Sequence, residues 1–178
     1  MASEGTHSMV DRMIRAARLD VDLFEEVEAD TSATRQALSV VVLVALATGI
    51  ASLATTGLSG LFVGVVVSIA GWAIWAWIVY LIGTKIIPSH ATHADWGQLA
   101  RTLGFAQSPG IFRVLGLVPV VGIFIFSAAS IWMLVAMVVA VRQALDYTST
   151  RRAIAVVLLG FIPYLLLTYM AFALLGAL

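Results

Sequence analysis

The side chains best suited to metal chemistry lie in one short cluster. His90, His93 and Asp95 form an H-x-x-H-x-D pattern, and imidazole with carboxylate can bind divalent metals. The spacing is compatible with one face of a helix, but no clear further ligand lies nearby and Pro88 indicates a turn. The cluster is therefore a weak candidate for a metal site, with a solvated interfacial loop as the alternative.

A second group of candidate residues surrounds a proline in an apolar segment. Residues 96–118 are long enough to cross a membrane, yet they contain Pro109, Arg101 and Arg113. A charge at the centre of a span costs about 2.5–3.5 kcal/mol on insertion scales. Arg113 either contacts a substrate or lipid headgroup beside the proline break, or its side chain reaches the outer interface. Arg101, Pro109 and Arg113 are the possible lipid or ligand contacts, with Arg101 nearer the inner boundary as an anchor.

Other chemistry finds little support. The apolar segments contain no carboxylate pair for acid–base catalysis and no His to ligate a haem, and no Gly-rich phosphate loop precedes a helix. The chain has no Cys, which excludes disulfides, thiolate metal sites and Cys nucleophiles. Its net charge of zero lacks the basic excess of a nucleic-acid-binding protein. We therefore predict no enzyme activity, no cofactor and no nucleic-acid partner.

The elements that must position these residues are membrane-spanning helices. Of the 178 residues, 61% are hydrophobic and 11% are charged, whereas a soluble domain carries roughly a quarter charged residues. A helix needs about 20 apolar residues to cross a bilayer. The stretches of this kind cover residues 37–56, 60–83, 96–118, 120–141 and 153–175. We predict an all-α polytopic membrane protein with about five transmembrane helices, the third broken at Pro109; the alternative is that 96–118 is re-entrant.

The first 35 residues differ from the rest of the chain. Apolar residues recur at helical spacing over 8–29, and Ser8 followed by Asp11 offers a capping-box-like start. The apolar positions are Val10, Met13, Ile14, Ala17, Val21, Phe24 and Val27. Arginines precede an acidic run, so the basic half of this amphipathic helix could meet anionic headgroups. We predict a cytoplasmic N-terminal region, 1–35, with this interfacial helix, and a transmembrane domain, 36–178.

The positions of Lys and Arg predict the orientation, because short loops rich in these residues stay cytoplasmic. With five spans, the N-terminal arginines, Lys85, Arg142, Arg151 and Arg152 fall on one side. Only Arg113 lies nearer the opposite side of the membrane. We expect a multi-pass protein of the cell membrane with a cytoplasmic N-terminus and an external C-terminus. The high Ala, Val and Leu content with a single Lys suggests a GC-rich bacterial source, hence a bacterial inner membrane.

Small residues form a stripe on the second predicted span. Gly60, Gly64, Ser68 and Gly71 recur at spacings of four and three, and such stripes let helix backbones approach closely in lipid. We predict that this face packs against another helix of the same chain, with a second copy as the alternative.

A set of residues that occur in a fixed order along the whole chain gives a family resemblance. A Leu, a basic residue and a Leu-Gly-aromatic-Ala run precede a Pro; a Pro and Gly turn, a span with an early Trp and an Arg-Ala pair follow. These positions are Leu99, Arg101, Leu103, Gly104, Phe105, Ala106, Pro109, Pro119, Gly122, Trp132, Arg152 and Ala153. In this set the chain resembles the Yip1 domain family of five-span membrane proteins.

The resemblance implies that the chain is a membrane protein, and it implies no particular reaction. Eukaryotic members bind small Rab-type GTPases and have a long cytoplasmic N-terminal region, which is reduced here to about 35 residues. We predict a non-enzymatic membrane-organising, scaffold or accessory role through helix packing, with membrane lipids and protein partners or a homo-oligomer. The alternatives are a small oligomeric transporter or channel using the Pro109 break and Arg113, and an accessory subunit of a larger energy-converting complex.

Overall fold

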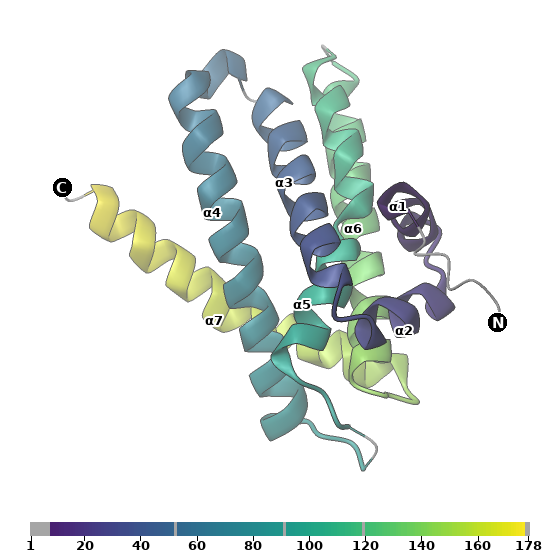
Figure 1. Cartoon of the computed structure of the whole chain (residues 1–178). Coiled ribbons are helices and arrows are strands. Elements are labelled where there is room, and N and C mark those ends of the chain that lie inside the picture. The colour runs from purple at the N-terminus through teal and green to yellow at the C-terminus, as the bar shows by residue number, and fades with distance from the viewer. Residues whose placement is uncertain (1–7, 52, 91, 119, 177–178) are drawn as a thin grey trace.

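The computed structural model describes residues 8–51, 53–90, 92–118 and 120–176, and all regular structure among them is helical. Long helices stand side by side in a bundle, and two short N-terminal helices lie against one flank of it (Figure 1). The predicted all-α membrane fold is therefore confirmed. Pro119, which belongs to the turn before the fourth predicted span, lies outside the described residues.

Four helices within the described ranges are long and apolar enough to cross a membrane. They belong to α3 (Ala33–Ala51), α4 (Leu53–Leu81) with its π-helical extension η1 (Ile82–Ile86), α6 (Gly122–Ala144) and α7 (Thr150–Gly176). Gly57 interrupts α4 with a φ of 65° and lies between the first two predicted spans, 37–56 and 60–83. The four helices match four of the five predicted spans.

The third predicted span, 96–118, is divided into two short helices. Helix α5 covers Trp96–Phe105, and the 3₁₀ helix η2 covers Ser108–Leu117. Pro109 lies in the first turn of η2, where a missing backbone N–H leaves no helical hydrogen bond unmade. The predicted break is thus present, and it changes the helix type as well as the direction of the chain.

The divided segment follows α3 along its length. Three of its glycines approach α3 so closely that an added Cβ would meet it at between 2.6 and 3.4 Å. The pairs, in order, are Gly104 with Ala37, Gly110 with Val44, and Gly116 with Ala51. Residues 37–51 rise roughly 21 Å as an α-helix. The segment 104–116 has fewer residues but covers a similar length, because a 3₁₀ helix rises about 2.0 Å per residue. Residues 104–116 therefore run beside residues 37–51 of α3, and a full crossing of the membrane by 96–118 stays a prediction.

The N-terminal region forms two helices, so the prediction of one helix over 8–29 is wrong. Helix α1 covers Met9–Ala17 and α2 covers Val21–Ala29. Leu19 between them has a φ of 61°, a left-handed conformation that ends a helix. The predicted start of the first helix is correct, because the Ser8 side chain accepts a hydrogen bond from the Asp11 amide.

The charges of α1 and α2 pair with one another across the turn. Arg12 contacts Glu26 at 2.9 Å and Asp30 at 2.8 Å, and its side chain is only 5% exposed. Arg15 contacts Asp20 at 2.7 Å and Glu26 at 2.6 Å. Two arginines of the half expected to meet lipid headgroups are therefore neutralised inside the protein.

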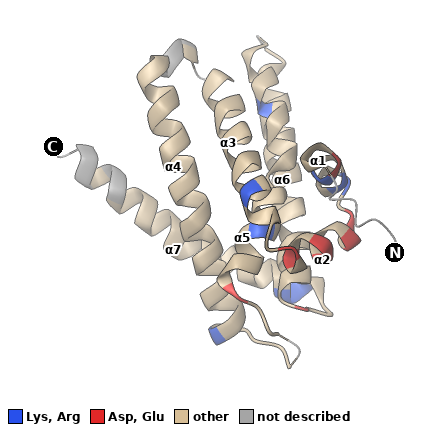
Figure 2. Ribbon diagram, in the orientation of Figure 1, with Lys and Arg blue, Asp and Glu red and all other residues tan. Residues whose placement is uncertain are grey.

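This helical pair is fastened to the bundle by apolar and polar contacts. Leu23, Phe24 and Val27 are fully buried in a cluster that includes residues of α3, α5 and α6. The Trp132 indole on α6 donates a hydrogen bond of 2.8 Å to the Ala17 carbonyl at the end of α1. The charged residues gather on this pair and at the lower end of the bundle (Figure 2), so the described part of the upper bundle carries almost no charge.

The close contact between α5 and α3 makes a testable prediction. Gly104→Ala would place its Cβ 2.8 Å from the Ala37 Cβ and 3.2 Å from the Ala37 carbonyl oxygen, and overpacking of this kind costs about 1–3 kcal/mol. We expect a lower midpoint of thermal unfolding in detergent, followed by Trp fluorescence.

Gly64→Ala is the matched control, because an added Cβ there has nothing within 4 Å. It should raise the midpoint slightly, since Ala favours a helix over Gly by up to about 1 kcal/mol. Equal midpoints for the two variants would contradict the packing described here.

Candidate functional site

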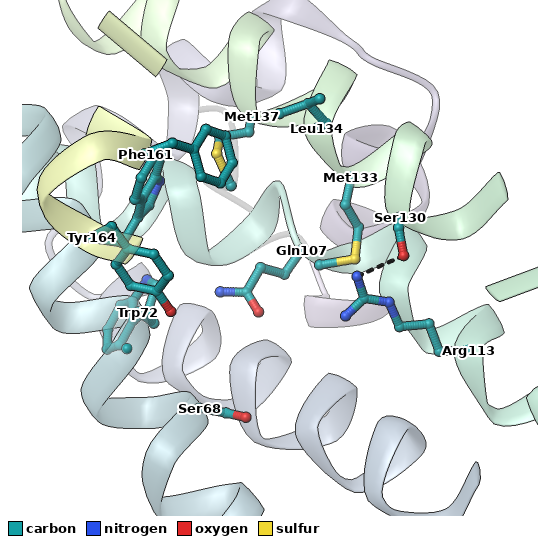
Figure 3. A pocket seen from close by; sticks show the side chains of 12 residues that line it. Ser68, Trp72, Gln107, Arg113, Ser130, Met133, Leu134, Met137, Phe161 and Tyr164 are labelled. Carbon is teal, nitrogen blue, oxygen red and sulfur yellow. Dashed lines mark hydrogen bonds between the residues drawn. The ribbon is translucent and has the colours of Figure 1, made fainter. Parts of the chain in front are cut away.

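A pocket of about 300 Å³ lies among α4, η2, α6 and α7, and Figure 3 shows it from close by. Twelve residues line it, and none of them is acidic. The lining residues are Ser68, Gly71, Trp72, Trp75, Gln107, Arg113, Ser130, Met133, Leu134, Met137, Phe161 and Tyr164. A positive charge and several neutral polar groups therefore share a largely apolar cavity inside the bundle.

Arg113 is the charged group of this pocket. One Nη donates a hydrogen bond of 2.9 Å to the Ser130 hydroxyl, and Cζ lies 4.9 Å from the centre of the Phe126 ring. Its Nε is buried and has no hydrogen-bond partner among the described residues. The guanidinium lies beside Met133 and points toward Gln107 (Figure 3). The structure thus places it between helices, which differs from the alternative of a side chain that reaches the outer interface.

Other polar groups of the pocket are also without partners in the described chain. The Trp75 indole is 5% exposed and its Nε1 makes no hydrogen bond. The Gln107 amide points into the middle of the cavity, and the Tyr164 hydroxyl faces it from α7 (Figure 3). A buried donor that stays unpaired costs about 1–3 kcal/mol. The pocket therefore offers more hydrogen-bond donors than its own residues satisfy.

Close packing between α4 and α7 holds the aromatic wall in place. The Trp75 and Phe161 ring centres are 4.8 Å apart, and Tyr164 meets Trp75 edge-on at 5.4 Å. Glycines make room for these rings: an added Cβ would lie 3.1 Å from Trp75 at Gly160 and 2.9 Å from the Tyr164 hydroxyl at Gly71. The aromatic groups are positioned by backbone that only small residues allow.

Beyond this wall the two helices separate. Figure 1 shows α7 sloping away from α4 toward its C-terminal end. Side chains on the facing sides of both helices are exposed there, with Val67 at 49% and Leu167 at 47%. The pocket lies where the separation begins, since its α7 residues are Phe161 and Tyr164.

The small-residue stripe of α4 meets different surroundings along its length. Gly71 faces Tyr164, and Ser68 lines the pocket. Gly64 has no atom of the described chain within 4 Å of an added Cβ, and Gly60 is partly buried. Packing within the chain accounts for the lower part of the stripe, while Gly64 is open to a neighbour from outside.

Arg101 and Pro109 lie away from the pocket. Arg101 is 6% exposed, and its guanidinium donates to the carbonyls of Val27, at 2.9 Å, and Glu28. These carbonyls belong to the last turn of α2, where a positive charge stabilises a helix. Pro109 is buried at the start of η2. Arg101 therefore joins α5 to α2, and Arg113 is the predicted contact residue that faces the cavity.

The predicted metal cluster is not brought together. Among the described residues no group of three His, Cys, Asp or Glu side chains is placed to hold a metal. Asp95 instead caps α5: its carboxylate accepts from the Gln98 amide at 2.8 Å, and the Gln98 side chain accepts from the Asp95 amide. His90 and His93 are exposed in the preceding loop, which agrees with the interfacial-loop alternative.

Sequence reasoning did not find Gln107, Ser130 or Tyr164. Gln107 is an isolated amide beside the Pro109 break, which is a usable signal. Ser130 and Tyr164 lie inside long apolar helices, and nothing in their spacing relates them to Arg113. Only the packing of α6 and α7 against η2 and α4 brings these groups to one cavity.

The titratable group with an unusual environment outside the spans is Glu28. Burial raises the pKa of its carboxyl from the ordinary value of 4.5 to about 7, and the negative charge of Asp146 adds to the shift. The Arg101 charge lowers this pKa, while Glu25 and Asp95 raise it further. The junction of α2 with α5 and the α6–α7 loop is therefore sensitive to protonation near neutral pH.

Comparison with known proteins gives one match. A family model described as the Yip1 domain matches residues 21–170. No curated protein and no solved structure matches the chain. The matched range begins at the first residue of α2 and ends within α7. It starts inside the predicted region 1–35, so the division of the chain at residue 36 stays a prediction.

The raised pKa of Glu28 predicts how stability varies with pH. Between pH 4.5 and about 7 the folded protein keeps a proton on Glu28 that the unfolded chain releases, so this contribution to stability falls as pH rises. The pKa values of Asp20, hydrogen-bonded by Arg15, and Asp30, hydrogen-bonded by Ser32, are held below the ordinary 3.8. Their contributions are lost only at lower pH.

Glu28→Gln should therefore flatten the pH dependence of the thermal unfolding midpoint between pH 4.5 and 8. Asp22→Asn, at an exposed acid of the same helix, is the control and should leave the slope unchanged. An unchanged slope in Glu28→Gln would show that the carboxyl ionises normally in the folded protein.

Proposed function

This chain belongs to the Yip1 domain family, and we propose that it is a non-enzymatic membrane protein that organises the membrane or serves as a scaffold through protein and lipid partners. Its apolar helices make it a multi-pass membrane protein. Its function then depends on which proteins or lipids these helices bind.

The observation that carries the proposal is the separation of α7 from α4. Where two helices of one bundle diverge, each leaves an apolar face uncovered. Here Val67 of α4, on the face that carries Gly71, is 49% exposed, and Leu167 of α7, on the face that carries Tyr164, is 47% exposed. Gly64 has no side chain and no neighbour within 4 Å of an added Cβ, so another helix can approach the α4 backbone closely there. Helix association in lipid depends on close van der Waals packing at small residues. A helix of a partner, or of a second copy, fits between α4 and α7 on these grounds.

The orientation belongs to the same proposal. Six of the ten Lys and Arg residues lie in or next to α1 or flank the loop between α6 and α7: Arg12, Arg15, Arg18, Arg142, Arg151 and Arg152. Such segments stay cytoplasmic. We place this end in the cytoplasm, the C-terminus outside, and the protein in the cell membrane, as in a bacterial inner membrane.

One observation favours the second candidate, a small oligomeric transporter or channel. Arg113 points into a cavity between helices, as expected of a residue on a substrate path. Against this reading, the cavity walls contain a single charged residue, and a path for ions or polar solutes usually carries more.

The scaffold proposal predicts a defined assembly. A tagged chain, extracted from its membrane into nanodiscs at native expression, should come with a stoichiometric partner chain or a second copy, measured by particle mass and protein identification. Gly64→Leu should release that partner because it adds bulk to the open face, while the midpoint of thermal unfolding stays within a few degrees. Gly64→Ala is the control and should retain the partner.

A monomer that carries lipid and no protein would overturn the scaffold part of the proposal and favour transport assays. A larger energy-converting complex in the same sample would make the chain an accessory subunit of that complex.

The orientation can be tested with single cysteines, since the chain has none of its own. Thr148→Cys lies in the α6–α7 loop, and Val121→Cys, 51% exposed, precedes α6. A membrane-impermeant maleimide applied to intact cells should label Val121→Cys and spare Thr148→Cys until the cells are opened. The reverse pattern would invert the proposed orientation.

A further inference from the structure

We infer that the pocket around Arg113 binds an anionic membrane lipid, with the headgroup at Arg113, Gln107 and Tyr164 and the chains directed between α4 and α7. The inference rests on the proposal that the protein acts through partners in the membrane, and it names the chemistry of one of them. The argument starts from the charge.

Arg113 is a cation inside the bundle without an anion of its own. In the part of the chain that the structure describes, the ion pairs belong to Arg12 and Arg15, and the pocket wall has no acid. The Ser130 hydroxyl and the Phe126 ring give partial compensation. A phosphate or carboxylate would complete it, because guanidinium and such anions form strong charge-assisted hydrogen bonds.

The neutral groups around the cation favour the same class of ligand. The Gln107 amide and the Tyr164 hydroxyl face the cavity. The nearby Trp75 Nε1 is buried and unpaired. All three groups can donate hydrogen bonds. Donors beside a cation favour a phosphate or carboxylate, and a zwitterionic headgroup would add an ammonium for which the pocket wall has no acid.

The rest of the pocket suits an apolar body attached to that anion. Met133, Leu134 and Met137 of α6 and Phe161 of α7 form the remainder of the wall, and unbranched Met side chains adapt to flexible chains. The cavity of about 300 Å³ accommodates a headgroup but not a whole phospholipid. The acyl chains therefore lie outside it.

The separation of α7 from α4 supplies the place for those chains. It begins at Tyr164, next to the pocket, and the facing sides of the two helices carry exposed apolar residues such as Val67 and Leu167. A lipid in the surrounding leaflet reaches the pocket sideways, between the helices. This access separates a lipid headgroup from a free phosphate ion, which would have to enter through apolar surroundings.

The test uses the full-length protein in nanodiscs of defined composition, read by native mass spectrometry and thermal unfolding. With one fifth phosphatidylglycerol in phosphatidylcholine, the wild type should retain bound phosphatidylglycerol, and its unfolding midpoint should exceed that in phosphatidylcholine alone. Arg113→Gln should reduce retention about tenfold or more, the scale of one charge-assisted hydrogen bond. Arg151→Gln, at an exposed arginine outside the pocket, is the matched control and should retain the lipid.

Tyr164→Phe keeps the ring packed on Trp75 and removes only the hydroxyl, so it tests the site even where Arg113→Gln fails to fold. We expect roughly threefold weaker retention, on the scale of one neutral hydrogen bond. Equal retention by the wild type, Tyr164→Phe and any folded Arg113→Gln would overturn the inference. So would millimolar inorganic phosphate stabilising the protein in phosphatidylcholine as well as phosphatidylglycerol does, since the ligand would then be the free ion.

The two occupants are neighbours between α4 and α7: the acyl chains take the part next to Tyr164, and the partner helix the part around Gly64, about 10 Å further along α4. Their readouts therefore differ. Loss of the protein partner with the lipid retained would overturn only the scaffold proposal, because the lipid readout needs no second protein. Retention of the partner with no lipid selectivity would overturn only the lipid site.

Discussion

The close contact of the 96–118 segment with α3 is the constraint on which the rest of the structure depends. Gly104 and Gly110 admit the α3 backbone and side chains at distances that no larger residue would tolerate. The contact forces α5 and η2 to run beside α3 as one broken segment. It also fixes which way η2 faces, because its glycines must point to α3. A 3₁₀ helix has three residues per turn, so Arg113 lies on the same face as Gly110. That face also borders α6, because an added Cβ at Gly110 would meet Met133 as well as Val44, and there Arg113 bonds Ser130.

The same contact explains the position of the N-terminal helices. With α5 held against α3, Arg101 reaches the end of α2 and bonds its last carbonyls. The acids of α2 in turn pair with Arg12 and Arg15 of α1. A chain of contacts thus links the middle of the membrane domain to its charged end. Glu28, at the junction, is the group through which protonation would act on that link.

The sequence predicted what depends on composition and local chemistry. Apolar length located the four long helices, Pro109 located the break, and Ser8 located the start of α1. It failed where long-range contacts decide. A helical pattern over 8–29 cannot reveal that Leu19 adopts a left-handed conformation, because that turn is stabilised by ion pairs between residues far apart in the pattern.

Arg113 is the clearest case of this limit. Its distance from the predicted span end makes the outer interface reachable, so a side chain extending to water was a physically sound alternative. The direction it takes depends on Ser130 and Phe126, which lie 17 and 13 residues later on another helix. Spacing along one chain does not show which helices become neighbours. For the same reason the sequence does not predict Tyr164, which lines the pocket with Arg113 only because α7 packs on α4.

The buried arginines are compensated differently in the charged and the apolar parts of the structure, and this difference argues for an external ligand. At the charged end, the buried arginines are satisfied by the chain itself, Arg12 by carboxylates and Arg101 by helix carbonyls. In the apolar part, Arg113 receives one hydroxyl and one ring and no acid from the described residues. Desolvated charge is more costly there, since water is absent. An arrangement that leaves the costlier cation less compensated is consistent with an anion supplied by the membrane.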